Sequence, residues 1–468
     1  MAYFTYGKFV EKIFGIDKSR ETPATKLIDE MDFMPLPTWR IFLIQFLNIA
    51  GLGPIFGAIA GAMFGPAAFL WIVLGSIFAG GVHDYLSGML SVRHNGLSIS
   101  EVVGIYLGNN VKYIMRVFTV ILLIFVGTVF LMGPAKIING MTGYIWNVWG
   151  WVSVILAYYI LSTLLPIDKL ISKLYPIFGI AMLLMAVGLL IALFFGDYQI
   201  PELIPENLVN MTSSPEETPL FPILFVTISC GAISGFHATQ SPLMARCMKN
   251  ESIGRKVFYG TMITEGIVAL IWAAAAMTFF GNVEGLNMAM NENNTNAAWA
   301  ANEISLNMLG KTGGLLALLG IVAAPITSGD TAFRSARLIL GDIFKSNQRL
   351  IKNRLYLSVP LFGVAFVLTQ LDFGLIWRYF AWCNQTLATI VLWTITAFLI
   401  YNRKAYWVSG IPALFMTMVC STYILIAPEG FNLSNDVAYI GGALITLFIT
   451  ILFLIYVKKQ SQTSTLYC

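Results

Sequence analysis

Long apolar runs recur along the whole chain, and each is long enough to cross a hydrocarbon core about 30 Å thick. Hydrophobic residues make up 57% of the 468 residues and charged residues only 11%, which is far more apolar than a soluble core of this length requires. Because lipid offers the backbone no hydrogen-bond partner, uninterrupted runs of this kind predict helices. The sequence therefore predicts an all-α polytopic membrane protein with about twelve transmembrane helices. The predicted spans are 39–63, 66–90, 113–134, 145–165, 170–195, 219–243, 257–280, 313–337, 355–371, 374–400, 406–427 and 437–457.

The basic residues indicate how these spans cross the membrane. If the N-terminus is placed in the cytoplasm and the sides alternate, the 28 Lys and Arg residues all fall inside except Lys136, Lys311 and Arg378. Cytoplasmic loops carry such an excess of positive charge. The sequence thus predicts a multi-pass protein of the cell membrane with both termini cytoplasmic. The net charge of +4 is scattered between apolar runs and forms no basic face, so the lipid bilayer is expected as its surroundings and nucleic acid is not expected as a partner.

Two of the apolar runs are interrupted by polar and helix-breaking residues. The sixth contains the string Cys230 to His237, and the first contains Asn48 to Pro54. Paired Gly and Pro interruptions in two halves of a chain point to a transporter binding site near the membrane midplane. The alternative is tight helix packing, since Gly231 and Gly235 are four residues apart. The predicted solute-binding residues lie at the two breaks and in the tenth span: Gly51, Gly53, Phe56, Ser234, Gly235, Phe236, His237, Gln240, Asn384 and Gln385. For Asn384 and Gln385, bridging between helices is an equal alternative.

The positions of the two breaks predict an inverted repeat. The first span runs from inside to outside and the sixth from outside to inside, because five helices separate them. We therefore expect a LeuT-like 5+5 inverted repeat followed by two additional helices. The predicted division is a cytoplasmic N-terminal tail with an interfacial helix (1–38), a transporter core (39–400, with repeats at about 39–196 and 219–400) and two C-terminal helices with a tail (401–468).

Four groups of residues resemble those of a known family. They are Gly81 to Tyr85 with Arg93, Asn95 and Gly96; Cys230 to His237; Asp330 and Thr331 with Arg334, Arg337 and Asp342; and Phe380 with Asn384, Gln385, Leu387 and Ala388. In these the chain resembles the carbon starvation protein CstA family of peptide and pyruvate transporters, within the amino-acid/polyamine/organocation superfamily. It departs from that pattern in its shorter length and in having His83 where Gln is common. The resemblance implies an inverted-repeat fold and a small organic solute such as a peptide, pyruvate or an amino acid.

Several ionisable residues lie in or at the ends of the apolar runs. An ionised side chain there costs several kcal/mol unless it is paired or hydrated. The candidates for proton coupling are Asp84, His237, Glu265 and Asp330. The alternative is a structural ion pair, most directly for Asp330, which precedes Arg334 by four residues. For His237, exchange of protons at its ordinary pKa of about 6.5 and a packing role both remain open.

The eighth span offers sodium as an alternative coupling ion. Ala324, Thr327 and Ser328 have the spacing by which LeuT-like symporters supply a carbonyl and two hydroxyls, and the first break would add the carbonyls of Leu47 and Ala50. Oxygen ligands of this kind suit a hard cation. Interhelical hydrogen bonding is the competing role for the two hydroxyls.

These observations favour a secondary active transporter that moves a small organic solute by alternating access, with protons preferred over sodium. Exposed N-termini of half-helices suit a carboxylate on that solute. A nucleotide-driven pump is disfavoured because the chain has no Walker A string, and an enzyme because it has neither an H-E-x-x-H motif nor a recognisable nucleophile site. The five cysteines show no CxxC spacing, and no cofactor is expected. A channel or facilitator and a membrane-embedded enzyme are the less favoured alternatives, and the sequence carries no signal for an oligomeric state.

Overall fold

A computed structural model describes residues 1–468 except 29–32, 144, 165–166, 349 and 465–468. In the described part of the chain the regular structure is helical throughout, so the all-α prediction is confirmed. In chain order the helices are α1 (Tyr6–Phe14), α2 (Pro23–Lys26), α3 (Thr38–Ile49), η1 (Gly53–Gly57), α4 (Ala58–Ala62), α5 (Ala67–Leu74), η2 (Gly75–Gly80), α6 (Gly81–Arg93), α7 (Ile99–Leu107), α8 (Asn109–Met141), α9 (Val148–Leu164), α10 (Ile167–Phe195), η3 (Pro205–Asn207), α11 (Leu220–Thr227), α12 (Gly235–Ala245), η4 (Glu251–Ile253), η5 (Arg255–Tyr259), α13 (Gly260–Phe279), α14 (Val283–Glu292), α15 (Ala297–Ala317), η6 (Leu318–Ala323), α16 (Ala324–Ile343), α17 (Ile351–Leu368), α18 (Phe373–Tyr401), α19 (Trp407–Ile426) and α20 (Asn435–Ser464).

Nine helical stretches among the described residues are long and apolar enough to cross a membrane. They are Ala67–Arg93, Asn109–Met141, Tyr175–Phe195, Glu251–Phe279, Thr312–Ile343, Ile351–Leu368, Phe373–Tyr401, Trp407–Ile426 and Asn435–Gln460. The pair α3 and η1–α4, bent by 54° at its break, counts as a tenth. The two remaining predicted spans correspond to α9, which has only 17 residues, and to the interrupted pair α11 and α12. Nine or ten of the twelve predicted crossings therefore have the length and composition of a membrane helix.

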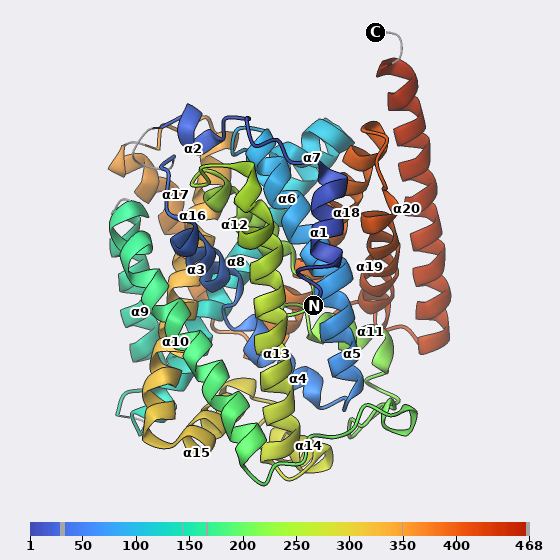
Figure 1. Cartoon of the computed structure of the whole chain (residues 1–468). Helices are drawn as coiled ribbons and strands as arrows, with labels where there is room; N and C mark the ends of the chain where they lie inside the picture. Colours follow the sequence, from blue (N-terminus) through green and yellow to red (C-terminus); the bar gives the residue numbers. More distant parts are fainter. Residues whose placement is uncertain (29–32, 144, 165–166, 349, 465–468) are drawn as a thin grey trace.

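The long helices run roughly alongside one another (Figure 1). Helix α8 is central in the packing and contacts α16, α18, α7 and α9. Helix α20 packs against α19 at the edge of the bundle, and only 17% of its apolar window is buried. In a bilayer this uncovered face is suited to contact with lipid, because apolar side chains there lose no hydrogen bonds. Residues 50–53 and 228–234, which form the two breaks, are all buried, so the breaks are shielded from the surroundings.

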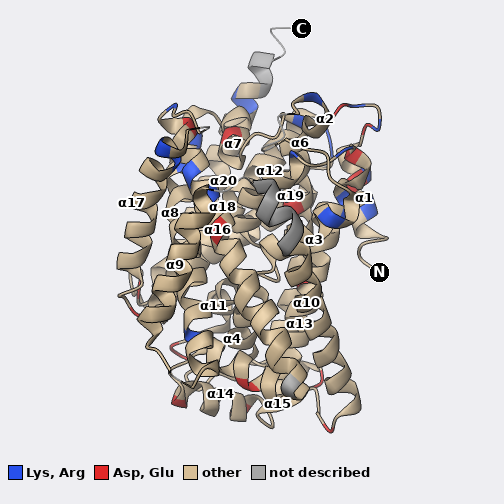
Figure 2. Cartoon of the chain, turned by 90° about the vertical axis from the view of Figure 1, so that its left-hand side faces the viewer, with Lys and Arg blue, Asp and Glu red and all other residues tan. Residues whose placement is uncertain are grey.

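Charge is distributed unequally between the two ends of the bundle. Figure 2 shows Lys and Arg gathered at the end that carries α2 and α7, whereas Asp and Glu occur at both ends. Helix α14, which contains Glu284 and Glu292, and the acidic loop 196–218 lie at the opposite end. This separation follows the sequence-based assignment of sides.

The predicted helix of the N-terminal tail is α1, and its apolar face packs on protein. Gly7, Val10 and Phe14 are buried, and a Cβ at Gly7 would lie 2.7 Å from the Tyr259 ring. We call residues 6–26 the N-terminal strap, because they are fastened to the Lys- and Arg-rich end of the bundle at several points. These contacts are an ion pair between Arg255 Nε and Glu11 Oε2 (3.0 Å) and three hydrogen bonds: Arg93 Nη2 to the Gly15 carbonyl (2.6 Å), the Asp17 amide to Glu251 Oε2 (2.9 Å) and Thr22 Oγ1 to the Met248 carbonyl (2.5 Å).

Candidate functional site

The first break lies between α3 and η1. Ala50 leaves the helical conformation (φ −84°, ψ 30°), and the chain restarts at Gly53 with a change of direction of 54°. Gly51 and Gly53 permit close approach of neighbouring elements, since a Cβ at Gly51 would lie 2.7 Å from the Phe130 ring and one at Gly53 would clash with Cys230. The two breaks therefore touch each other through a glycine of one and a cysteine of the other. This contact supports the prediction that both breaks belong to one site.

The second break is the non-helical stretch 228–234 between α11 and α12. Gly231 has a φ of 89°, a conformation that residues with a Cβ rarely adopt. Gly235, the first residue of α12, lies directly against α18: an added Cβ would be 2.6 Å from the Ala388 amide nitrogen and 2.7 Å from the Leu387 Cβ. Of the two roles considered for Gly235, helix packing is the one for which this geometry gives direct evidence.

Asn384 joins the second break to α18. Its Oδ1 accepts a hydrogen bond from the Phe236 amide (2.7 Å), and its Nδ2 donates to Ser234 Oγ (2.9 Å). It thereby satisfies a free N–H group at the start of α12, as an N-cap residue would. Gln385 donates from Nε2 to the Phe225 carbonyl (3.2 Å) and ties α18 to α11 as well. Both carboxamides bridge helices, which is the alternative that the sequence left open.

Asp84, His237 and Glu265 meet in one buried cluster, although they come from α6, α12 and α13. Asp84 Oδ2 lies 2.8 Å from His237 Nδ1, and His237 Nε2 lies 3.4 Å from Glu265 Oε2. All three side chains are fully buried. Asp84 Oδ1 also lies 2.7 Å from His83 Nδ1. The imidazole of His237 thus lies between two carboxylates: it is hydrogen-bonded to Asp84, whereas its Nε2 is close to Glu265 Oε2 without a hydrogen bond between them.

Backbone groups of the second break complete this Asp84–His237–Glu265 cluster. The Gly231 amide donates to Glu265 Oε1 (3.1 Å), so a change at the carboxylate is directly connected to the non-helical stretch. Cys230 Sγ, a ring nitrogen of His237 and a carboxylate oxygen of Glu265 lie within 4.8 Å of one another, a donor set that a transition metal could use after a small contraction. The structure brings together three of the four residues predicted for proton coupling.

Asp330, the fourth, belongs to a different group. Its Oδ1 accepts a hydrogen bond from Ser162 Oγ of α9, and its Oδ2 lies 3.7 Å from Arg334 Nη2. Arg334 also donates from Nη2 to the Ser162 carbonyl at 3.4 Å. The intrahelical ion pair that the spacing suggested is present, and the hydrogen bonds of both residues to Ser162 link α16 to α9.

Four of the five residues considered for sodium lie close together. Ser328 Oγ is 3.1 Å from both the Leu47 and the Ala324 carbonyl oxygens, and Thr327 Oγ1 donates to the Ala324 carbonyl at 2.7 Å. The Ala50 carbonyl takes no part in these contacts. Hydroxyl and carbonyl oxygens fit a hard cation, but in this arrangement the Ser328 hydroxyl bonds α16 to the end of α3. Interhelical bonding, the competing role, is therefore observed.

Two residues of α3 that are not among the predicted solute-binding residues have unusual surroundings. Gln45 and Asn48 are 0% and 1% exposed, and neither their side-chain oxygens nor their nitrogens have a hydrogen-bond partner among the described residues. Gln240 of the neighbouring α12 donates to Thr239 Oγ1 (3.0 Å) but leaves its Oε1 without a partner in the described part of the chain. A buried polar group without a partner costs about 1–3 kcal/mol. Two carboxamides three residues apart in an apolar run are the sequence signal that could have identified this polar surface.

The aromatic residues predicted to line a cavity differ in their surroundings. Phe236 is 1% exposed and packs edge-on against Phe130, with 6.1 Å between ring centroids. Phe56 lies 5.7 Å from the Trp377 ring and borders a pocket described below.

Comparison with known proteins identifies the family. The profile of carbon starvation protein CstA matches residues 1–161 and 140–375. The chain belongs to the CstA family. It is 43% identical over 338 residues to an uncharacterized membrane protein of Haemophilus influenzae, covering 62% of this chain and 91% of that one. It is 25% identical over 493 residues to the peptide transporter CstA of Bacillus subtilis (84% and 82%).

Another relative is named for a different solute. The chain is 24% identical over 355 residues to the pyruvate/proton symporter BtsT of Escherichia coli, covering 62% of this chain and 49% of that one. Members of the CstA family are therefore named for transport of peptides and of pyruvate. Their names agree with the expectation that this CstA-family chain is a multi-pass membrane transporter and not an enzyme.

Proposed function

We propose that this CstA-family chain is a secondary active transporter that couples proton movement to a small organic solute through the Asp84–His237–Glu265 cluster. The observation that carries the proposal is the buried imidazole held between two carboxylates. With His237 protonated and both carboxylates ionised, the three side chains carry one net negative charge, and one further proton makes them neutral. Burial in low dielectric penalises the charged state. The cluster therefore takes up a proton most favourably while water still reaches it, before it is closed off.

The connection of the cluster to the second break supports coupling to the solute. Glu265 accepts from the Gly231 amide, and His237 lies in the first turn of α12. A change in protonation alters hydrogen bonds to the non-helical stretch itself. The solute is proposed to lie beside the two breaks, with Gln45, Asn48 and Gln240 offering donors and acceptors to it. Peptides, pyruvate and amino acids are the candidates, on the basis of the names of the relatives.

The proposed architecture has twelve crossings, arranged as a LeuT-like 5+5 inverted repeat with α19 and α20 added. It is supported by the two breaks in corresponding positions and by the helices found at each predicted span. Both termini are proposed to be cytoplasmic, with the Lys- and Arg-rich end inside.

This orientation predicts the labelling of single cysteines introduced into a background that gives no signal of its own. Cysteines at Thr212 and Thr295 are expected to react with an impermeant thiol reagent applied to intact cells. A cysteine at Asn347 is expected to react only after the membrane is opened. Of the five native cysteines, Cys230, Cys247, Cys383 and Cys420 are buried, and Cys468 lies outside the described residues, so Cys468 must be replaced to give a background without signal. Reversed labelling would contradict both the orientation and the repeat assignment.

The proton proposal is tested by uptake of pyruvate and of short peptides into vesicles that contain the purified chain. An imposed pH gradient is expected to drive accumulation, and an imposed sodium gradient without a pH gradient is not. The alternative, sodium coupling, is favoured by the closeness of the Leu47, Ala324, Thr327 and Ser328 oxygens. Accumulation driven by sodium alone, and lost in Thr327→Ala, would overturn the proton proposal. Uptake indifferent to both gradients would make the protein a channel or facilitator.

A further inference from the structure

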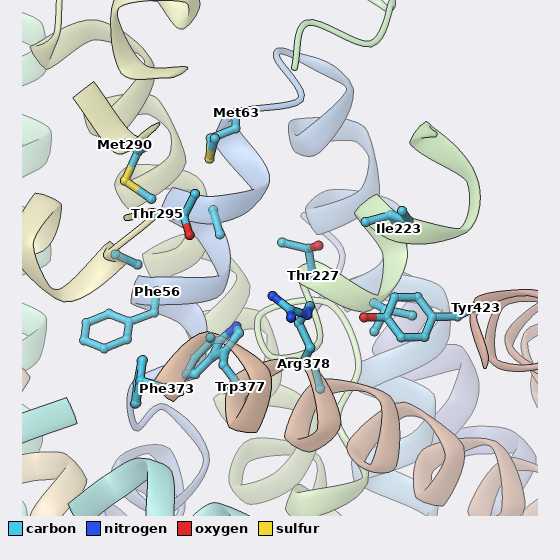
Figure 3. Close-up of a pocket in the computed structure, with 15 residues that line it drawn as sticks. Phe56, Met63, Ile223, Thr227, Met290, Thr295, Phe373, Trp377, Arg378 and Tyr423 are labelled. Carbon is cyan, nitrogen blue, oxygen red and sulfur yellow. The ribbon is translucent and has the colours of Figure 1, made fainter. Parts of the chain in front are cut away.

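A pocket of about 160 Å³ opens beside the two breaks (Figure 3). Phe56 of η1 contributes to one wall, and Thr227, the last residue of α11, contributes to another. The pocket lies toward the end of the bundle that carries α14, opposite the Lys- and Arg-rich end. Most of its lining is apolar, formed by aromatic, methionine and aliphatic side chains. The large members of that lining are Phe56, Met63, Ile223, Met290, Phe373 and Trp377.

Arg378 is the charged side chain of this pocket. It extends from α18 between Trp377 and Thr227 (Figure 3) and is 48% exposed. Its Nε donates to Glu429 Oε2 at 3.1 Å, while Nη1 and Nη2 have no hydrogen-bond partner among the described residues. A guanidinium presents its donors in a fixed fork that matches a carboxylate. Nη1 and Nη2 are therefore free to donate hydrogen bonds to a carboxylate.

Glu429 fixes the orientation of this guanidinium and does not fill the pocket. It is 2% exposed, and Tyr423 donates from its hydroxyl to Oε1 at 2.5 Å. Tyr379 of α18 donates to the Glu429 backbone carbonyl at 2.9 Å. The loop after α19 is thus fastened to α18 on the Nε side of Arg378. The opposite side of the guanidinium remains directed toward the apolar walls.

We propose that this pocket binds a small organic monocarboxylate with a short apolar body, the carboxylate on the Nη atoms of Arg378 and the body against Trp377 and Phe56. This inference rests on the proposed function, since it names the class of solute that approaches the breaks from this side. A cavity of about 150 Å³ holds a molecule the size of benzene. The pocket volume of 160 Å³ therefore suits a ligand with one short branched chain better than a peptide with two large side chains. A single cation in a mostly apolar lining selects such a ligand over a sugar or a cation.

The inference is tested by direct binding to the purified full chain in nanodiscs, followed by calorimetry. The probe is 4-methyl-2-oxopentanoate, and its carboxamide is a neutral control of the same shape. We expect the wild type to bind the acid about tenfold or more tightly than the amide, because the amide forfeits a charge-assisted pair of hydrogen bonds. R378Q is expected to lose the same factor for the acid and to leave the affinity for the amide unchanged. R378K is expected to retain part of the preference, since it keeps the charge without the fork.

R403Q is the matched control, because Arg403 is exposed and follows α18 at the opposite end of that helix. It is expected to bind the acid as the wild type does. Equal affinity of the wild type for acid and amide, no measurable binding of the acid, or an unchanged acid affinity in R378Q would each overturn the inference. The comparison of acid and amide needs no substitution, so it holds even if R378Q does not fold. Binding of the acid without any gradient-driven uptake would instead contradict the proposed transport function and leave this site standing.

Discussion

Vesicles containing Asp84→Asn are expected to lose pH-gradient-driven accumulation down to the level of empty vesicles. Asparagine cannot ionise, so the cluster with His237 and Glu265 no longer alternates between a charged and a neutral state. The amide also brings donors to a place where Asp84 faces His83 Nδ1 and His237 Nδ1 at 2.7 and 2.8 Å. One of these contacts then becomes donor against donor unless an imidazole changes its tautomer. Removing one partner of a buried ion pair costs about 3–5 kcal/mol, so the amount of folded protein must be measured with every assay.

Counterflow separates loss of coupling from loss of binding. In counterflow, labelled solute exchanges for unlabelled solute across vesicles without an imposed ion gradient. If Asp84→Asn still exchanges solute but no longer accumulates it, the cluster couples protons to transport. Glu284→Gln, which changes an exposed carboxylate on α14, is the control and is expected to behave as the wild type in both assays. Undiminished accumulation by Asp84→Asn would refute the proposed coupling role.

Gly235→Ala is expected to destabilise the folded protein by about 1–3 kcal/mol, the usual cost of inserting a group into a closely packed core. The new Cβ would lie 2.6 Å from a backbone nitrogen of α18, and backbone yields less easily than the end of a flexible side chain. The substitution must therefore displace α12 from α18 and strain the bonds from Asn384 to Ser234 and Phe236. Thermal unfolding of the detergent-solubilised protein, read by a size-exclusion assay, measures the effect.

The matched control is Gly363→Ala in α17. Nothing lies within 4 Å of a Cβ added at Gly363, and alanine exceeds glycine in helix propensity by up to about 1 kcal/mol. This control is expected to leave the unfolding temperature unchanged or to raise it. A Gly235→Ala protein that unfolds at the wild-type temperature would mean that α12 and α18 separate at no cost, and close packing would no longer account for the glycine. Leucine at the same position would add volume to the same clash.

Sequence reasoning reached the helices and the two breaks, because apolar run length and Gly or Pro interruptions are local signals. It also selected Asp84, His237 and Glu265, since each is an ionisable residue in an apolar environment. Sequence reasoning could not predict that these three residues meet, because α6, α12 and α13 come together through tertiary packing that no spacing in the chain encodes. Asp330 has the same local signal and belongs to another group, because Ser162 and Arg334 are its neighbours in space.

Glycine illustrates a second boundary of sequence reasoning. An interruption containing Gly231 and Gly235 predicts a break. Why glycine is needed at each position is shown only by the φ angle and the neighbouring atoms in the structure. Gly231 is required by its backbone conformation, and Gly235 by the closeness of α18. Gln45 was overlooked because a carboxamide in an apolar run commonly forms a hydrogen bond to a neighbouring helix, and its spacing from Asn48 was not considered. Arg378 was noted only as a basic residue outside the cytoplasmic regions, because the elements that form its pocket are distant in sequence.

If the protein transports by alternating access, as proposed, we expect the N-terminal strap to give the two half-cycles unequal barriers. We expect opening of the Lys- and Arg-rich end to separate α6 from the α12–η5 connection. The bonds from Arg93 to Gly15 and from Asp17 to Glu251 join both of these elements to the strap. Each of these bonds must break or move with its partner before water reaches the cluster from that side. The opposite end has an open pocket beside the breaks. We therefore expect the ligand-free protein to rest with the strapped end shut, and turnover to be limited by release of solute into the cytoplasm.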